Sequence, residues 1–306
     1  MREATAFLDG RFVTAADLRL PLDDAGFLLG VTVSERLRTF GGSLFRLDAH
    51  LARLRRSLEI VGLDPRIASR DLGQAAERLI DVNLQRERQS ELGLAILVTP
   101  GTWNASHAAG WPQPRVMMHT HRLAFGRWAP LYDRGATLVT VDIRQVPQAC
   151  WPRELKCRSR MHYYLAGMQA ESKQPGATPL LLDVEGFVTE TPTANVVLFR
   201  RGEGLLSPPQ SQILPGISLG VLRELAADEK MPFSERPLRV ADLHTAEELM
   251  LTSTSYGLLP VTRFDGQAVG RATPGPVYRR LFDAWSHLVG MNLAAEARRG
   301  AAMSDA

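Results

Sequence analysis

The stretch Glu154-Leu-Lys-Cys-Arg158 contains Lys156, and lysine is a rare residue type in this chain. Three of the 36 lysine and arginine residues are lysines, so arginine is the usual cation here. A lysine can lose its proton when it is buried and then act as a nucleophile, which an arginine cannot do. The other two, Lys173 and Lys230, lie in polar runs typical of a solvated surface. Lys156 is therefore a candidate nucleophile, with an ordinary structural or surface lysine as the alternative.

Length and composition are typical of a soluble globular protein. The 306 residues can form one large domain or two ordinary ones, and 45% of them are hydrophobic and 23% charged. No apolar run reaches the roughly 18 residues that span a bilayer, and the N-terminal residues lack the apolar core of a signal peptide. The formal charge of +3, without a basic block, argues against a nucleic-acid partner.

The cysteine content points to a reducing compartment. Cys150 and Cys157 are too few for a disulfide framework, and their spacing fits no metal motif. Free thiols suit the cytoplasm. We therefore expect a cytoplasmic protein that holds no metal and binds no membrane.

In the first half, turn signals and periodicity predict a domain of mixed helices and strands. Asp9-Gly10 and Gly41-Gly42 are typical turns, and Asp48 is a candidate cap for a helix that ends at Gly62. We expect a hairpin over 4–13, strands over 31–40, 43–46, 92–99 and 115–120, and a second helix over 69–85. The long irregular loop over 100–114 is either functional or a surface insertion.

The second half has its own set of predicted elements. We expect strands over 136–143, 180–183, 184–189, 195–199 and 249–255, and helices over 159–172, 217–228 and 276–297. Asp265-Gly266 is a further hairpin turn. Because periodicity is lost near residue 122, we predict domains over 1–122 and 133–297, an interdomain loop over 123–132, and a frayed polar tail over 298–306.

Three features could bind a phosphate. Leu214-Pro-Gly-Ile-Ser218 places Gly216 just before a helix, whose first amides and dipole attract anions. The run Thr252-Ser-Thr-Ser255 ends a strand with hydroxyl donors, and Arg53 lies on a helix from which it could turn inward. Taken singly, each also fits an ordinary loop with Ser218 as cap, a solvated strand end or an outward arginine.

Glu190 is a carboxylate at the end of a predicted strand, before Thr191-Pro-Thr-Ala-Asn195. Alone it fits a surface residue. Beside a nucleophilic lysine and a phosphate site it has a specific use, because a carboxylate can keep a pyridine nitrogen protonated so that the ring draws electrons. A lysine, a phosphate site and such a carboxylate are together the requirements of pyridoxal 5′-phosphate.

Taken together, the motifs resemble the class IV aminotransferase family of fold type IV, which includes branched-chain aminotransferases, D-amino-acid aminotransferases and 4-amino-4-deoxychorismate lyases. The resemblance covers nearly the whole chain. The motifs, in order, are Asp24-Ala-Gly-Phe-Leu-Leu-Gly30, Ala49-His-Leu-Ala-Arg-Leu54, Lys156, Leu182-Asp-Val-Glu-Gly-Phe-Val-Thr-Glu-Thr-Pro-Thr-Ala-Asn195, Leu214-Pro-Gly-Ile-Ser218, and Leu251-Thr-Ser-Thr-Ser255 through Leu259-Pro-Val261.

The resemblance implies an α+β fold and a role for each motif. It implies a smaller N-terminal α/β sandwich, a larger C-terminal pseudo-barrel that binds the cofactor, a homodimer, and a site at the domain junction. It implies that Lys156 forms the Schiff base and shuttles a proton, and that Glu190 holds the ring nitrogen. The remaining positions implied for binding the cofactor are Arg53, Asn195, Gly216, Ile217, Ser218, Ser253, Thr254 and Ser255.

The sequence departs from its relatives just after the lysine. Aminotransferases of the family usually have an asparagine and then a tyrosine for the phenolic oxygen of the cofactor. Here Ser159 and Arg160 stand near those positions, with Tyr163 or Tyr164 as a possible replacement for the tyrosine. An arginine there resembles the lyase branch.

Substrate recognition has several candidates. Ser34 replaces an aromatic residue of many relatives, which suggests a more open or more polar pocket. Pro100 stands where enzymes for D-amino acids have a basic residue, which argues against a D-alanine enzyme. The candidates for the substrate carboxylate are Arg38, Arg158 and Arg160, each of which could also be structural.

Three functions follow as hypotheses. The first is an aminotransferase that moves an amino group between an amino acid, possibly branched-chain, and a 2-oxo acid. The second is a lyase that converts aminodeoxychorismate to 4-aminobenzoate and pyruvate. The third is a protein that binds pyridoxal 5′-phosphate without turnover.

Overall fold

The computed structural model describes residues 4–87, 91–103 and 114–304, and contacts divide the chain into two compact units. Unit 1 comprises Met1–Leu123 and Glu154–Ser159, and unit 2 comprises Ala124–Arg153 and Arg160–Ala306. The segment that contains Lys156 therefore belongs to unit 1, although it lies in the second half of the sequence. Most of the loop over 100–114 lies outside the described residues, so the expectation that it is either functional or a surface insertion stays a prediction.

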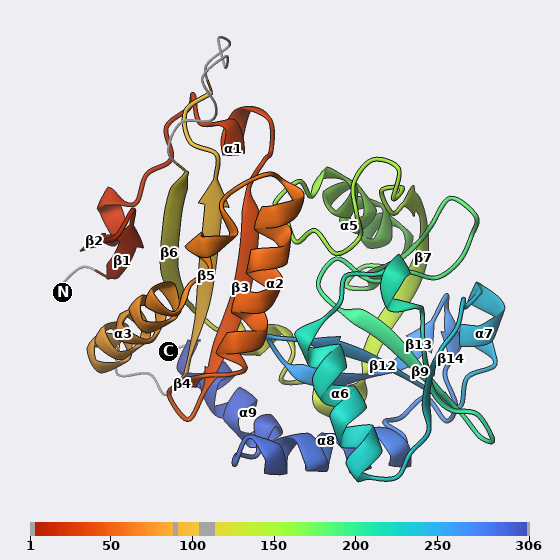
Figure 1. Ribbon diagram of the computed structural model, residues 1–306. Helices are drawn as coiled ribbons and strands as arrows, with labels where there is room; N and C mark the ends of the chain where they lie inside the picture. The colour runs from red at the N-terminus through yellow and green to blue at the C-terminus, as the bar shows by residue number, and fades with distance from the viewer. Residues whose placement is uncertain (1–3, 88–90, 104–113, 305–306) are drawn as a thin grey trace. The chain divides into compact units, whose positions relative to one another are not determined.

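Unit 1 is an antiparallel sheet with two helices on one face (Figure 1). Within the described residues the sheet has six strands in the order β2-β1-β6-β5-β3-β4. The strands are β1 (Thr5–Leu8), β2 (Arg11–Thr14), β3 (Val33–Phe40), β4 (Ser43–Leu44), β5 (Leu92–Thr99) and β6 (Arg115–Arg122). The helices are η1 (Ala15–Asp17), α1 (Ala25–Leu28), α2 (Leu47–Ile60), η2 (Pro65–Ile67) and α3 (Arg70–Glu87).

The core of unit 1 forms where α2 and α3 cover the sheet. Leu54 and Leu58 of α2 and Leu79 of α3 pack against Leu37 of β3 and Ile96 of β5. The predicted hairpin at Asp9-Gly10 is confirmed, and so are the strand over 92–99 and the end of α2 at Gly62.

The predicted cap of α2 is wrong. The helix begins at Leu47 after Arg46, which adopts a left-handed backbone with φ 54°, so Asp48 lies inside the first turn. An acidic side chain there still interacts favourably with the helix dipole.

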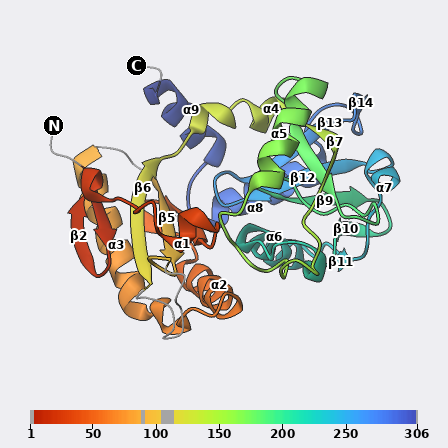
Figure 2. The same ribbon diagram turned by 90° about the horizontal axis from the view of Figure 1, so that it is seen from above.

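Unit 2 is built on a mixed sheet with helices on both of its faces (Figure 2). Within the described residues its main path is β11-β10-β9-β12-β13-β7-β8, and β14 pairs with β13. Helix α5 contacts β7 and β8, and α6 and α8 contact β12. The strands are β7 (Ala136–Arg144), β8 (Thr178–Leu182), β9 (Asn195–Arg200), β10 (Gly204–Ser207), β11 (Phe233–Glu235), β12 (Glu248–Ser253), β13 (Gly257–Phe264) and β14 (Gln267–Ala268). The helices are η4 (Phe125–Arg127), α4 (Leu131–Arg134), α5 (Met161–Lys173), η5 (Gln210–Gln212), α6 (Ile217–Asp228), α7 (Val240–His244), α8 (Pro276–Leu288) and α9 (Leu293–Ser304).

Several expectations for unit 2 need correction. Residues 184–186 form a tight turn, because the amides of Gly186 and Phe187 both bond to Asp183. The rest of the predicted strand pairs with β8 through an isolated bridge, in which Val188 lies opposite Leu182, and the Thr189 amide donates to the Leu181 carbonyl. The closing helix divides at Gly290, which has φ 65°, into α8 and α9. The predicted hairpin turn at Asp265-Gly266 is confirmed by the pairing of β13 with β14. Strands β10 and β11 and the short helix α7 were not predicted.

The expectation of a frayed tail from Arg298 is also wrong. Helix α9 continues to Ser304, and Arg298 forms an ion pair with Asp133 at 2.7 Å. Gly300 lies so close to Phe125 that a Cβ there would stand 2.1 Å from the ring. The glycine thus allows the helix to pack closely, which its position near the chain end did not suggest.

Replacing Gly204 with alanine is expected to destabilise the protein by about 2–5 kcal/mol. Gly204 has φ 87°, and a Cβ there would lie 2.4 Å from the carbonyl oxygen of Pro232. Gly202 has the same φ but open space around it, so Gly202→Ala isolates the backbone cost of about 1–2 kcal/mol. Urea unfolding of both variants tests this, and equal losses would contradict the close-approach argument.

Candidate active site

Lys156 is held against the start of β3 within unit 1. Its carbonyl oxygen accepts a bond from the Ser34 amide at 2.9 Å, and the Arg158 amide donates to the Thr32 carbonyl at 2.8 Å. The Lys156 amide donates to the Ser57 hydroxyl on α2 at 3.2 Å, and Leu155 packs against the core of the unit. The backbone of the lysine is thereby fixed on two elements, while its side chain is half-buried.

The Arg53 side chain is held by the buried carboxylate of Glu35, which was not among the residues predicted from the sequence. Glu35 on β3 has 0% exposure and accepts from Arg53 Nε at 2.7 Å and from Arg53 Nη2 at 2.8 Å. The Nδ1 atom of His50, also buried, lies 2.8 Å from the second oxygen of Glu35. The structure thus joins β3 and α2 through one carboxylate and two basic side chains.

The charges of this cluster shift two pKa values. Burial alone would raise the pKa of Glu35, but the charge and hydrogen bonds of Arg53 and His50 outweigh it and hold that pKa well below its ordinary range. Burial lowers the pKa of His50, with the nearby charges of Arg53 and Lys156 acting in the same direction against the pull of Glu35. His50 is therefore neutral at pH 7, and its Nδ1 donates to Glu35.

The other candidates of unit 1 lie in different surroundings. Ser34 is buried beside the lysine segment, and Arg158 is exposed on it. Arg38 lies four residues farther along β3, about 13 Å away at the usual strand rise. Its guanidinium stacks 3.9 Å from the Phe40 ring, and its Nε donates to the Thr39 carbonyl. Of the three arginines proposed for the substrate carboxylate, Arg158 is the nearest in sequence to Lys156.

Glu190 of unit 2 is buried in a shell of hydrogen-bond donors. Its Oε1 accepts from Gln145 Nε2 at 2.8 Å and from the Tyr163 hydroxyl at 2.9 Å. Its Oε2 accepts from the Leu214 amide at 3.2 Å and from Asn195 Nδ2 at 3.3 Å. Donors stabilise the charged form of a carboxylate, so this arrangement suits an anionic Glu190.

Arg160 and Tyr164, the other candidates on this segment, differ in whether they lie beside Tyr163. The Arg160 guanidinium is 4.6 Å from the centre of the Tyr163 ring, and its Nη2 donates to the Pro192 carbonyl. The His162 ring is 3.9 Å from the same ring. Tyr164, by contrast, is 66% exposed. Tyr163, rather than Tyr164, therefore belongs to the cluster around Glu190.

The predicted phosphate site lies where α6 begins. Gly216 precedes the helix and offers no capping side chain to its first amides. A Cβ on Gly216 would stand 2.0 Å from Asn195 Oδ1, so only glycine fits beside this amide. Thr252 of β12 lies opposite Asn195 of β9. The buried hydroxyl of Thr252 has no hydrogen-bond partner within the described residues. Ser253 donates to the Thr193 carbonyl at 2.8 Å, and Thr254 and Ser255 form the turn that follows.

These observations fit pyridoxal 5′-phosphate. An uncapped helix start and an unpartnered buried hydroxyl offer donors to a phosphate, and Glu190 offers an acceptor to a protonated ring nitrogen. No group of three His, Cys, Asp or Glu side chains in the described ranges is arranged to hold a metal ion. None of the helices described has the length and apolar character needed to cross a membrane.

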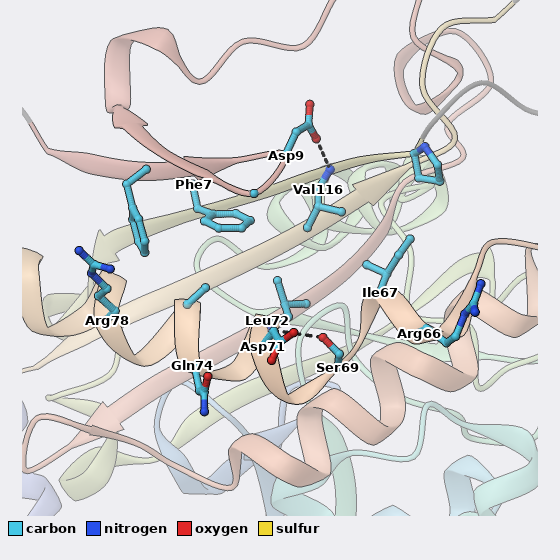
Figure 3. Close-up of a pocket in the computed structure, with 14 residues that line it drawn as sticks. Phe7, Asp9, Arg66, Ile67, Ser69, Asp71, Leu72, Gln74, Arg78 and Val116 are labelled. Atoms are coloured by element: carbon cyan, nitrogen blue, oxygen red, sulfur yellow. Dashed lines mark hydrogen bonds between the residues drawn. The ribbon is translucent and has the colours of Figure 1, made fainter.

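A separate cavity of about 760 Å³ lies between the β1–β2 hairpin and α3 in unit 1 (Figure 3). Phe7 and Val116 line one side, and Leu72 and Arg78 line the other. The Arg78 guanidinium stacks 5.0 Å from the Phe12 ring. The lining includes none of the residues predicted for the cofactor or the substrate. This cavity is therefore separate from the residues around Lys156 and Glu190.

Comparison with known sequences supports one family. A family model described as amino-transferase class IV matches residues 32–264. The D-alanine aminotransferase of Bacillus licheniformis is 27% identical over 276 residues, which cover 89% of this chain and 93% of that protein. The D-alanine aminotransferase of Staphylococcus haemolyticus is 28% identical over 289 residues, or 92% and 97% of the two chains.

Comparison with solved structures confirms the predicted α+β fold of type IV. The T.th. branched-chain amino acid aminotransferase, in complex with N-(5′-phosphopyridoxyl)-L-glutamate, has a TM-score of 0.81 at 22% identity over 95% of both chains. The branched-chain aminotransferase of Thermoproteus uzoniensis, with norvaline, has a TM-score of 0.81 at 22% identity over 94% of this chain and 96% of that one.

The names of these relatives differ in substrate and agree in reaction. The argument from Pro100 against a D-alanine enzyme therefore stays a prediction. Because the family model spans most of its length, this chain belongs to the class IV aminotransferases, pyridoxal 5′-phosphate enzymes that move amino groups between amino acids and 2-oxo acids.

Proposed function

We propose that this protein is an aminotransferase that carries its cofactor as a Schiff base on Lys156, with a branched-chain amino acid as the first substrate to test. The observation that supports it best is the donor shell of Glu190, since an anionic carboxylate is the partner that a protonated pyridine nitrogen requires. The branched-chain suggestion rests on the names of the structural relatives.

Each residue has a defined part in this proposal. When bound, pyridoxal 5′-phosphate supplies a ring that withdraws electrons and stabilises negative charge on the substrate's α-carbon. The Nζ atom of Lys156 would take the proton from the α-carbon of the substrate and deliver it to the cofactor. Glu190 accepts a hydrogen bond from the ring nitrogen, and Asn195 orients Glu190.

Three groups of donors are proposed to bind the phosphate. Arg53 supplies a charge that Glu35 holds in one orientation. The amides of Ile217 and Ser218 supply the helix start beside Gly216. Hydroxyls from Thr254 and Ser255 complete the group in the proposal, whereas the hydroxyl proton of Ser253 is already donated to the Thr193 carbonyl. The Thr252 hydroxyl is added because it is buried without a partner in the described part of unit 2.

The substrate carboxylate is assigned to Arg158 or Arg160. Arg38 is a weaker candidate, because its guanidinium is already stacked on Phe40. Ser34, beside the lysine segment, leaves room for a larger or more polar substrate side chain than an aromatic residue would.

Half-reaction assays on the purified protein distinguish the three hypotheses. Conversion of bound cofactor to its pyridoxamine form by an amino acid, without any second substrate, supports transamination. Pyruvate release from aminodeoxychorismate without a 2-oxo acid would support the lyase, which the names of the relatives do not favour. Failure of both over a broad panel would leave binding without turnover. Borohydride reduction and peptide mapping must place the cofactor on Lys156, and a different residue would refute the assignment.

Replacing Gly216 with alanine is expected to weaken cofactor binding about ten-fold or more, because the new Cβ displaces the Asn195 amide. Gly220 lies four residues farther along α6 with open space around it, so Gly220→Ala is a matched control. The control is expected to stabilise the helix by about 0.5–1 kcal/mol and to leave binding unchanged. Titration of both apoproteins with the cofactor measures this, and equal affinities would contradict the role of Gly216.

We propose in addition that the protein is a cytoplasmic homodimer. Met161, Tyr164, Leu165 and Met168 recur at helical spacing on α5 and are 71%, 66%, 43% and 58% exposed. Contiguous exposed apolar surface is typical of an interaction site. Both cysteines have free thiols, which suits a reducing compartment. Light scattering should give twice the mass of one chain, and Met168→Glu should lower it, whereas a monomer at all concentrations would contradict the proposal.

A further inference from the structure

The Tyr163 hydroxyl is committed to the Glu190 carboxylate. A phenol has one proton to donate, and here it points to Glu190 Oε1 at 2.9 Å. The phenolic oxygen of Tyr163 accepts from Gln145 Nε2 at 2.8 Å. Gln145 Nε2 also donates to Glu190 Oε1 at 2.8 Å, so the three side chains form a closed triangle. A tyrosine used in this way does not donate its proton to the phenolic oxygen of a cofactor.

The triangle is supported from several elements. Gln145 is buried, and its Oε1 accepts from the Val146 amide at 3.1 Å. Arg160 and His162 lie against the Tyr163 ring at 4.6 Å and 3.9 Å. The position of the Tyr163 hydroxyl is thus determined by packing on its ring and by two hydrogen bonds.

Burial and the charge of Glu190 keep the Tyr163 hydroxyl protonated, so that it can always donate to Glu190. Burial, aided by the negative charge of Glu190, raises the pKa of Tyr163 well above its ordinary value of 10. The hydroxyl therefore keeps its proton throughout the working pH range. Burial and the charges of Arg160 and Arg153 lower the pKa of His162 to about 4, so His162 is neutral at pH 7. Of the cations around the triangle, Arg153 interacts electrostatically with Glu190, and Arg160 with Tyr163.

We infer that Tyr163 and Gln145 are positioning residues that act through Glu190 to keep the proton on the cofactor's ring nitrogen. Every donor to a carboxylate stabilises its charge and makes it a weaker base. With donors on both oxygens, Glu190 leaves the shared proton on the ring nitrogen. With one donor fewer, Glu190 becomes a stronger base and draws that proton toward itself. The inference rests on the proposed function, because it concerns the same cofactor.

The test uses the holoenzyme loaded with pyridoxal 5′-phosphate labelled with ¹⁵N in the ring. In the wild type, the ¹⁵N chemical shift is expected at the protonated position from pH 6 to 9. Tyr163→Phe is expected to shift the protonation equilibrium about ten-fold toward the unprotonated ring, since a hydrogen bond to a charged group is lost. Gln145→Leu should act in the same direction and provides a second variant in case Tyr163→Phe does not fold.

Tyr164→Phe is the matched control. It removes the same hydroxyl from the next residue, which is 66% exposed on the proposed dimer surface of α5 and lies outside the cluster around Glu190. Because the phenylalanine keeps the apolar ring on that surface, the ¹⁵N signal should stay in place. If Tyr163→Phe binds the cofactor with an unchanged ¹⁵N signal, the inference is wrong while the proposed function stands. If the wild type forms no borohydride-stable link to Lys156, the proposed function fails and the inference fails with it.

Discussion

Lys156→Arg is expected to lower the rate of the amino-acid half-reaction by at least about 10³-fold. Arginine keeps the positive charge and most of the volume of lysine, but it cannot supply an unprotonated amine. The backbone bonds of the segment to Ser34, Thr32 and Ser57 do not involve the side chain, so the fold should be retained. Stopped-flow spectra of the cofactor measure the rate, and thermal unfolding checks the fold.

The matched control for this prediction is Lys173→Arg. Lys173 lies on α5, forms an ion pair with Asp142 at 3.3 Å and is 40% exposed. An arginine can make the same ion pair, so both rate and stability should stay near the wild-type values. A Lys156→Arg variant that retains a tenth of the wild-type half-reaction rate would show that another amine carries the chemistry.

Residues that act through their own motif could be predicted from the sequence. Lys156 stood out by composition, and Glu190 and Gly216 by their places at a strand end and a helix start. These signals are local, because they depend on residue type and on neighbours within a few positions. The order of the motifs then predicted the family, which the comparisons confirm.

Residues that act through distant partners could not be predicted in the same way. Glu35 contacts Arg53 and His50 only because α2 packs on β3. Tyr163 contacts Glu190 only because α5 packs against β8, which precedes the turn that leads to Glu190. One signal for Glu35 was present. The alternation of β3 places it on the same face as Val33 and Leu37, and a charged residue in a core position requires a partner. Which partner it finds depends on tertiary contacts.

Glu35→Gln is expected to lower the free energy of unfolding at pH 7 by about 3–5 kcal/mol. The substitution keeps the shape of the side chain but removes its charge and replaces one acceptor oxygen with an NH2 donor. Arg53 and His50 are then left with one acceptor between them and with a donor facing them. Urea denaturation of the full chain measures the loss. Glu59→Gln, on the same helix as Arg53, is the control: Glu59 pairs with Arg56 at 3.4 Å on the surface and should contribute at most about 1 kcal/mol.

The pH dependence of the Glu35 effect has a definite sign. The folded protein holds the pKa of Glu35 well below its ordinary value of 4.5, so the folded state binds this proton less readily than the unfolded chain. The stabilisation by the carboxylate is therefore complete above about pH 5 and is lost as the pH falls below 4.5 toward the folded pKa. The stability difference between wild type and Glu35→Gln should narrow steadily from about pH 4.5 to 3. A gap that stays constant down to about pH 3 would mean that packing, and not the charge on Glu35, holds Arg53 in place.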